Sequence, residues 1–293
     1  PPAPPPPQRH RGLRDSPAAL VKGDTLWLFA GRDQNGNQSG YVMKDWLVFS
    51  TTDMKHWTQY PVPLKVEDFK WAASKQAYAG HVAERNGKYY WYVSTNWCGI
   101  GVAVSDKITG PYKDALGKPL LTNKDCFDSH HSWACIDPAV FIDDDGQAYL
   151  TWGNRECYIV KLKDNMIETE GEVKRIHIDE SHPFTEAPWI HKHDGKYYLT
   201  YASEWPEKIA YAVADHIEGP YETKGIISEI AGNSNTTHPA IVNFKGQWIF
   251  ISHNGGLPTG TSYSRSVVAE PMEYNADGSI KPIPPTAEGV KPL

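Results

Sequence analysis

The chain has 293 residues and a formal net charge of −6, and its longest apolar runs are only strand-sized. It has no basic stripe to displace counterions from a nucleic acid and no apolar run able to span a bilayer, so we expect neither partner. The 11 tryptophans and 16 tyrosines favour strands, and we expect most of these rings in a core.

Residues 1–13 (PPAPPPPQRHRGL) are rich in proline and poor in apolar residues, which predicts an extended lead-in without a hydrophobic signal segment. Residues 14–293 are expected to form a single domain. The four cysteines lack the spacing of zinc ligands. Cys126 and Cys135 either pair in an oxidising compartment or remain free thiols.

A tight turn followed by an aromatic strand recurs five times along the chain, as in NGKYYWYVS from Asn86 and DGKYYLTYA from Asp194. Asn-Gly and Asp-Gly pairs supply the positive φ angles that a tight hairpin needs. A short apolar strand precedes each turn, and a second pair of strands follows it. Four strands per repeat, with a spacing of roughly 50 to 65 residues, predict an all-β fold, a five-bladed β-propeller. The turn glycines are Gly23, Gly87, Gly146, Gly195 and Gly246.

The first strand of each propeller blade lines the central channel, so residues at the starts of these strands converge on one mouth. Carboxylates at such a rim cost free energy unless they are solvated, paired with another group or retained for a function. Glycoside hydrolysis needs two acids, one to protonate the leaving oxygen and one to activate water or attack. These positions therefore indicate a glycosidase, the alternative being carboxylates that only cap strand ends. The residues at the five starts include Asp15, Tyr78, Asp137, Glu186 and His238.

Other side chains near these acids are candidates for contacts with a sugar. Flat rings can stack on sugar faces, and the candidates for stacking are Trp71, Tyr78, Trp97 and Trp205. Polar side chains can bond to sugar hydroxyls, and the candidates are Asp33, Asn154, His253 and Asn254. Trp152 and Trp189 are expected in the core.

The blocks CIDPAVFIDDDGQAYLTWG, FTEAPWIHKHDGKYYLTYA and NTTHPAIVNFKGQWIFISHNG resemble glycoside hydrolase family 43, and most of all its members that act on arabinoxylan. The resemblance extends from about Asp15 to about Ile283. It implies a five-bladed propeller that carries an inverting glycosidase, in agreement with the repeat count.

The resemblance also implies roles for single residues. Glu186 matches the general acid of the family, and Asp137 matches the aspartate that orients this acid and keeps it protonated. Arg265 matches an arginine of the pocket near the catalytic acids. His238 matches a histidine beneath the pocket, which in relatives often lies beside a calcium ion or a water cluster, so calcium near His238 is the cofactor to test.

The general base is where this chain departs from the family pattern. The family has an aspartate directly before the proline of the first blade, and this chain has Ser16 there. A serine alone cannot act as a general base. Asp15 lies one residue earlier and has the same spacing to its proline as Glu186 has to Pro188. We therefore expect Asp15 to be the base.

The resemblance implies an exo-acting α-L-arabinofuranosidase that releases arabinose from arabinoxylan or its oligosaccharides. Two alternatives stay open. One is a bifunctional enzyme or a predominant β-xylosidase, because the two pentoses present similar hydroxyl patterns. The other is a non-catalytic carbohydrate-binding propeller, which Ser16 favours. The expected partner is a plant cell-wall polysaccharide or oligosaccharide, and the expected location is secreted or periplasmic, or cytoplasmic if oligosaccharides are imported.

Overall fold

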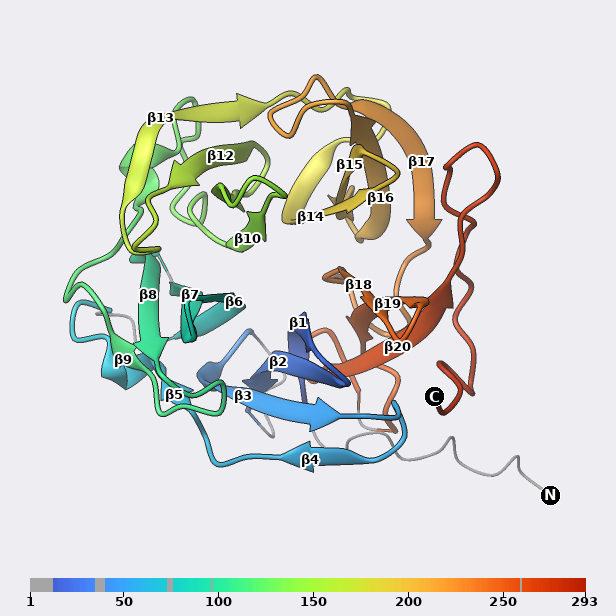
Figure 1. Cartoon of the computed structure of the whole chain (residues 1–293), viewed down its shortest axis with the longest axis horizontal. Coiled ribbons are helices and arrows are strands. Elements are labelled where there is room, and N and C mark those ends of the chain that lie inside the picture. The colour runs from blue at the N-terminus through green and yellow to red at the C-terminus, as the bar shows by residue number, and fades with distance from the viewer. Residues whose placement is uncertain (1–12, 35–39, 73–75, 96, 259) are drawn as a thin grey trace.

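The computed structural model describes residues 13–34, 40–72, 76–95, 97–258 and 260–293. Most of the expected lead-in, residues 1–12, lies outside the described residues. The strands form five separate sheets around a central channel, so the predicted five-bladed β-propeller is confirmed (Figure 1). In the described part of the chain, no helix is long and apolar enough to cross a bilayer.

Blades one and two hold the first strands of the chain. Blade one contains β1 (Asp15–Lys22), β2 (Thr25–Asp33), β3 (Met43–Thr51) and β4 (Trp57–Gln59), with β5 (Leu64–Lys65) also paired to β3. Blade two contains β6 (Ala77–Arg85), β7 (Lys88–Thr95), β8 (Gly99–Ser105) and β9 (Lys113–Asp114). Two short 3-10 helices, η1 (Val66–Asp68) and η2 (Asn123–Asp125), lie in the loops after β5 and β9.

Blades three to five continue the same antiparallel pattern. Blade three contains β10 (Ala139–Ile142), β11 (Ala148–Trp152), β12 (Cys157–Leu162) and β13 (Thr169–Ile176). Blade four contains β14 (Phe184–His193), β15 (Lys196–Ser203), β16 (Lys208–Ala214) and β17 (Glu222–Ser228). Blade five contains β18 (Ala240–Phe244), β19 (Gln247–Asn254) and β20 (Ser266–Met272).

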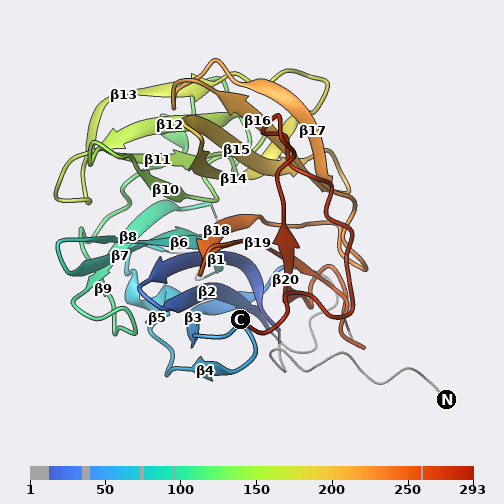
Figure 2. The ribbon, with the colours of Figure 1, turned by 45° about the vertical axis from the view of Figure 1, so that its right-hand side comes forward.

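Blade five differs from the predicted repeat, because its sheet has three strands in the described part of the chain instead of four. The segment after β20 is rich in proline, which lacks the N–H group that a ladder needs. This segment instead bonds to blades four, five and one, through Ile283 N to Ile227 O (2.7 Å), Val290 N to Ala269 O (3.2 Å) and Leu293 N to Asp53 O (2.9 Å). In Figure 2 it is drawn in dark red, on the outer side of the ring.

The spaces between blades are filled by large aromatic side chains. Trp46, Trp91 and Trp152 are all at most 1% exposed, and the ring of Trp91 packs edge-on against Phe29 at 5.2 Å. The core positions expected for Trp152 and Trp189 agree with their exposed fractions of 0% and 7%. Such burial stabilises the ring of blades by removing apolar area from water.

The two cysteines that the sequence left open are buried free thiols whose side chains lie within hydrogen-bonding distance of each other. Burial raises the pKa of the Cys135 thiol well above its usual value, and its neighbour Cys126 adds to this effect. The pair lies in the core between blades two and three, beside Trp152, whose Nε1 donates to Cys126 Sγ at 3.3 Å.

The hydrogen bond from Arg14 N to Arg265 O, 2.8 Å long, ties the start of the described chain to blade five. It joins the residue before β1 to the residue before β20. The first and last blades are therefore held together at the same end of the channel where the first strands begin.

Gly153→Ala is expected to destabilise the protein more than Gly171→Ala, although both glycines have positive φ angles of 135° and 78°. At Gly153 a Cβ atom would lie 1.9 Å from the carbonyl oxygen of Glu156, whereas nothing lies within 4 Å at Gly171. Gly171→Ala carries only the strain of left-handed backbone, about 1–2 kcal/mol. Gly153→Ala adds a backbone clash. Urea unfolding of both variants measures the difference, and equal losses would contradict this account.

Candidate active site

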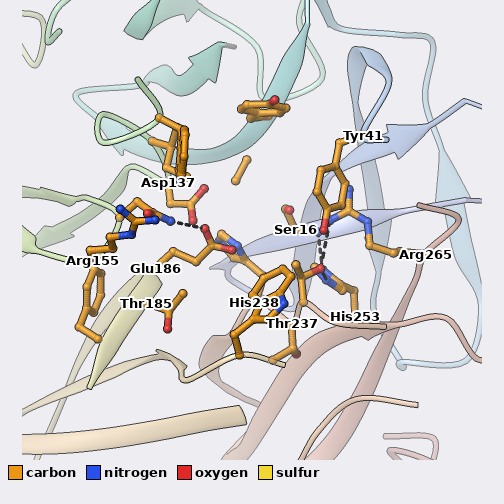
Figure 3. Close-up of a pocket in the computed structure, with 18 of the residues that line it drawn as sticks. Ser16, Tyr41, Asp137, Arg155, Thr185, Glu186, Thr237, His238, His253 and Arg265 are labelled. Carbon is orange, nitrogen blue, oxygen red and sulfur yellow. Dashed lines mark hydrogen bonds between the residues drawn. The ribbon is translucent and has the colours of Figure 1, made fainter. Parts of the chain in front are cut away.

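A cavity of about 640 Å³ opens at the end of the channel where the first strands begin. All five blades contribute to its wall, with Ser16, Tyr78, Asp137, Glu186 and His238 among the lining residues. In Figure 3 the carboxyl groups of Asp137 and Glu186 point toward one another, and Ser16 faces them from the side of blade one. Residues far apart in the sequence thus share one sugar-sized space.

Left-handed backbone before a proline shapes three of these positions. Ser16, Asp137 and Ala187 have φ angles of 46°, 61° and 62°, and each precedes a proline. Non-glycine residues rarely adopt such angles, and they interrupt the pairing at the starts of β1 and β14. In blade three the residue with positive φ, Asp137, itself lines the cavity, whereas in blade four the preceding residue, Glu186, does so.

Asp137 is a buried carboxyl held next to Glu186. It is 6% exposed, and its Oδ2 accepts a hydrogen bond of 3.1 Å from the backbone N–H of Ala187, the residue after Glu186. Burial, together with the nearby charge of Glu186, raises the pKa of Asp137 well above its usual value. This bond fixes the start of β14, so Asp137 orients the segment that carries Glu186.

Glu186 is only partly buried and is held by Asn154. The side-chain nitrogen Nδ2 of Asn154 donates to Glu186 Oε2 at 2.8 Å, and Asn154 Oδ1 lies 2.9 Å from His131 Nε2. Because the amide uses its N–H on Glu186, its oxygen must accept from His131. Burial lowers the pKa of His131. A chain of donors thus runs from His131 through Asn154 to Glu186, and the sequence analysis did not identify His131.

Glu207 is a second carboxyl that the sequence analysis missed. It immediately precedes β16, is 0% exposed, and its Oε2 accepts from the backbone N–H of Thr237 at 3.1 Å. Burial, with the charge of Glu186 and a side-chain hydrogen bond to it, raises the pKa of Glu207 well above its usual value. In the sequence Glu207 is one charge among several in SEWPEKI, and no pattern marks it as buried.

Arg265 holds two buried aspartates beneath the cavity wall. Its Nη2 lies 2.8 Å from Asp33 Oδ1 and 3.1 Å from Asp15 Oδ2, and its Nε donates to Asp33 Oδ2 at 2.9 Å. The guanidinium is 4% exposed and lies 4.9 Å from the ring centre of Tyr41. A buried cation shared by two carboxylates keeps both charges compensated in a medium of low polarity.

The structure does not place Asp15, the expected base, at the cavity. Both carboxylate oxygens of Asp15 are shielded from solvent, and the side chain that lines the cavity from the start of β1 is Ser16. Burial raises the pKa of Asp15 to about 6, against the opposing effect of Arg265. The comparison of Asp15 with Glu186 fails because β1 follows the backbone pattern of blade three, in which the residue with positive φ faces the cavity.

Two further expectations for sugar contacts are also corrected. Both carboxylate oxygens of Asp33 bond to Arg265, so Asp33 anchors this arginine and does not line the cavity. Trp71 lies outside the cavity wall, packs on Phe69 at 5.5 Å and donates to Asp114 Oδ2 at 3.1 Å. Its ring occupies the space left by Gly101, where a Cβ atom would come within 2.4 Å of the indole.

The remaining candidates, apart from Asn254, do lie at the cavity. Trp97 and Trp205 are each 60% exposed at the rim, where they are free to meet a ligand. Trp133, which the sequence analysis did not identify, joins them at 39% exposed. Further lining residues are Tyr78, Asn154, His253 and Arg265. Asn254 instead accepts from Ser266 Oγ (3.3 Å) and from the N–H of Gly256 (2.9 Å).

His253 holds Ser16 in place. Its Nδ1 accepts from the backbone N–H of Ser16 at 2.9 Å, so the neutral ring carries its proton on Nε2 and donates to Thr236 Oγ1 at 2.9 Å. Burial, and then Arg265, lower the pKa of His253 well below its usual value. Both ring nitrogens are therefore engaged within the protein, and His253 fixes the backbone of Ser16 rather than a sugar hydroxyl.

Calcium near His238 stays a prediction, which the charged groups that act on this residue do not support. Burial first, and then Arg265 and His81, lower the pKa of His238 to about 3. Calcium takes six to eight oxygen ligands, which a guanidinium and imidazoles do not supply. Within the described ranges, no group of three or more His, Cys, Asp or Glu residues could hold a metal.

Arg265→Met is expected to lower the free energy of unfolding by about 3–5 kcal/mol, because it leaves two buried carboxylates without their cation. The loss should shrink as the pH falls, since protonation of Asp15, whose pKa burial already raises to about 6, removes part of the uncompensated charge. The control is Lys163→Met, which breaks a solvent-exposed ion pair to Glu168 and should cost about 0–1 kcal/mol. Urea unfolding at several pH values measures both variants, and equal, pH-independent losses would refute the assignment.

Comparison with known proteins identifies the family. The model of glycosyl hydrolases family 43 matches residues 10–280. A xylosidase/arabinosidase 43A from Humicola insolens is 32% identical over 323 residues, covering 90% of this chain and 94% of the relative. The structure of an α-L-arabinofuranosidase from Clostridium thermocellum matches with a TM-score of 0.81 at 36% identity, over 95% of each chain.

A second solved structure is that of a β-xylosidase/α-arabinofuranosidase from a compost microbial metagenome, in complex with xylotriose and in a calcium-free form. It matches with a TM-score of 0.85 at 28% identity and covers 94% of this chain and 96% of that chain. The fold of this chain agrees with those of these two solved structures. This chain belongs to glycosyl hydrolases family 43.

Proposed function

We propose that this chain is an inverting, exo-acting hydrolase that releases α-L-arabinofuranose from arabinoxylan or arabinoxylo-oligosaccharides. The observation that carries the proposal is the placement of Glu186 at the cavity, held by Asn154 and adjoining the buried carboxyl of Asp137. Relatives named as xylosidase/arabinosidase and as arabinoxylan arabinofuranohydrolase support a pentose substrate. A polymeric substrate favours a secreted or periplasmic location, and imported oligosaccharides would favour the cytoplasm.

In this reaction Glu186 donates its proton to the glycosidic oxygen as the bond to the sugar breaks. Asp137 orients the acid through its bond to Ala187 N. Water attacks from the opposite face of the sugar ring and gives up a proton to the solvent, and this attack inverts the anomeric configuration. Tyr78, Trp97 and Trp205 offer aromatic surface for sugar rings at the cavity.

The alternatives make different predictions for the products. A bifunctional enzyme or a β-xylosidase would release xylose from xylobiose, whereas an arabinofuranosidase would release arabinose from arabinoxylan or arabinan. The placement of Ser16 at the cavity and of Asp15 away from it favours a second candidate, a carbohydrate-binding propeller with little or no turnover. Binding of these sugars without release of free pentose would support that candidate.

Glu186→Gln is expected to lower kcat on an arabinoxylo-oligosaccharide by about 10²–10⁴-fold, because the amide cannot donate a proton to the leaving oxygen. The fold should stay intact, since Gln can still accept from Asn154. The control is Glu270→Gln, which removes a carboxyl of β20 that accepts from Thr286 and lies outside the cavity wall. Sugar release and thermal melting are measured for both, and full activity of Glu186→Gln would remove this residue from the mechanism.

Ser16→Asp is expected to raise kcat by about 10²-fold or more, because it places a carboxylate at the cavity opposite Glu186, where a general base is needed. Asp15→Asn should leave kcat within a few-fold of wild type, because the oxygens of Asp15 are shielded from solvent. The same oligosaccharide assay measures both variants, with melting temperatures recorded to detect any loss of folding. Complete loss of activity in a folded Asp15→Asn variant would establish Asp15 as the base after all.

A further inference from the structure

Glu207 is a fully buried carboxyl group next to the proposed acid, and its placement is tightly defined. Its backbone N–H donates to Asn235 O at 2.8 Å, and its Oε2 accepts from Thr237 N at 3.1 Å. In the described ranges, Oε1 has no assigned donor, and the adjacent Lys208 pairs with Glu204 and Glu229. A buried carboxylate without a cation is costly, so such a group retains its proton.

The titratable groups that act most strongly on the charge of Glu207 are acidic. Glu186 from β14 and Asp137 from the segment before β10 both disfavour a negative charge on Glu207. Tyr41, which lies between β2 and β3, is a third neighbour, since Glu207 is among the charges that act on its phenol. These neighbours make the neutral form of Glu207 the stable one.

Counting donors and acceptors then places the proton of Glu207. Because Oε2 already accepts from the backbone of Thr237, the hydroxyl is on Oε1, the oxygen without another partner. The hydrogen-bonding neighbour of this carboxyl group is Glu186. A protonated carboxyl donates to an ionised one in a short, strong bond.

We propose that Glu207 is a positioning residue, a permanently protonated acid that donates a hydrogen bond from Oε1 to Glu186. This rests on the proposed role of Glu186 as the acid. When Glu186 gives its proton to the glycosidic oxygen, its carboxylate is stabilised by two donors, Asn154 Nδ2 and the Glu207 hydroxyl. Glu207 keeps its own proton throughout, and water returns a proton to Glu186 after the product leaves.

The first experiment compares Glu207→Gln with Glu207→Leu. The amide of Gln can accept from Thr237 and donate to Glu186, so its kcat should stay within about 3-fold of wild type, with an unchanged pH–rate profile. Leu cannot donate, and its kcat on an arabinoxylo-oligosaccharide should fall about 10–100-fold. The basic limb of its profile should move to higher pH, because the carboxylate of Glu186 is then less stabilised.

A change of leaving group separates this role from a structural one. Glu207→Leu should lose little rate on a dinitrophenyl arabinofuranoside, whose leaving group needs no protonation. Equal losses on both substrates, or a Leu variant with the wild-type profile, would overturn the proposal. Glu270→Gln and Glu270→Leu, which alter a buried carboxyl of β20, should move neither limb of the profile.

A measurement that needs no turnover tests Glu207 independently of the proposed function. Infrared spectra at neutral pH should show a protonated-carboxyl C=O band in the wild type that is weakened in Glu207→Gln and kept in Glu270→Gln. If Glu207→Gln leaves this band unchanged, or moves the basic limb to lower pH, Glu207 is ionised and the proposal fails.

Full activity of Glu186→Gln with loss of the band in Glu207→Gln would instead refute only the role of Glu186. Should Glu207→Leu not fold, the Gln variant alone decides.

Discussion

Burial of carboxyl groups at the mouth of the channel is the constraint on which the site depends. A carboxylate removed from water must be paired with a cation or keep its proton. Asp15 and Asp33 meet this condition through Arg265, which contacts both at 2.8–3.1 Å. Asp137 and Glu207 meet it by having raised pKa values, each through burial first and through Glu186 second.

Glu186 differs from these neighbours because it remains partly open to the cavity. Its carboxyl group lies beside acids that favour their neutral forms, and it accepts a bond from Asn154, which in turn accepts from His131. Asp137 and Glu207 are thus buried carboxyl groups that favour their protonated forms, and Glu186 is the neighbouring acid that a ligand in the cavity can reach. This is the chemistry that protonation of a leaving oxygen requires.

The backbone contributes as much to the site as the side chains do. Ser16, Asp137 and Ala187 adopt left-handed angles before prolines. The backbone N–H groups of Ser16 and Ala187 donate to the side chains of His253 and Asp137, and these bonds hold two of the segments in place. The same kink orients Asp137 in blade three and Ser16 in blade one toward the cavity. The side chain of Asp15 is therefore directed to Arg265. Its ion pair with this arginine links blade one to blade five, and it has no part in the proposed reaction.

The repeat of turns and aromatic strands determined the propeller, because hairpin geometry follows from local Asn-Gly and Asp-Gly pairs and a four-stranded blade needs a fixed length of chain. It also determined that Asp137, Glu186 and His238 share a cavity, because strand starts meet wherever blades form a ring. The sequence did not predict that, within the described residues, blade five has three strands, because the C-terminal segment makes its contacts with the distant blades four and one.

Only the tertiary structure decided which acid faces the cavity in blade one and which aspartates are held by Arg265. A shift of one residue at Ser16 reverses the direction of a side chain, and no local pattern fixes it. Likewise, Glu207 and His131 acquire their roles from neighbours that are 21 and 23 residues or more away in the chain. Burial, which sets the protonation of these groups, exists only once all five blades close around the channel.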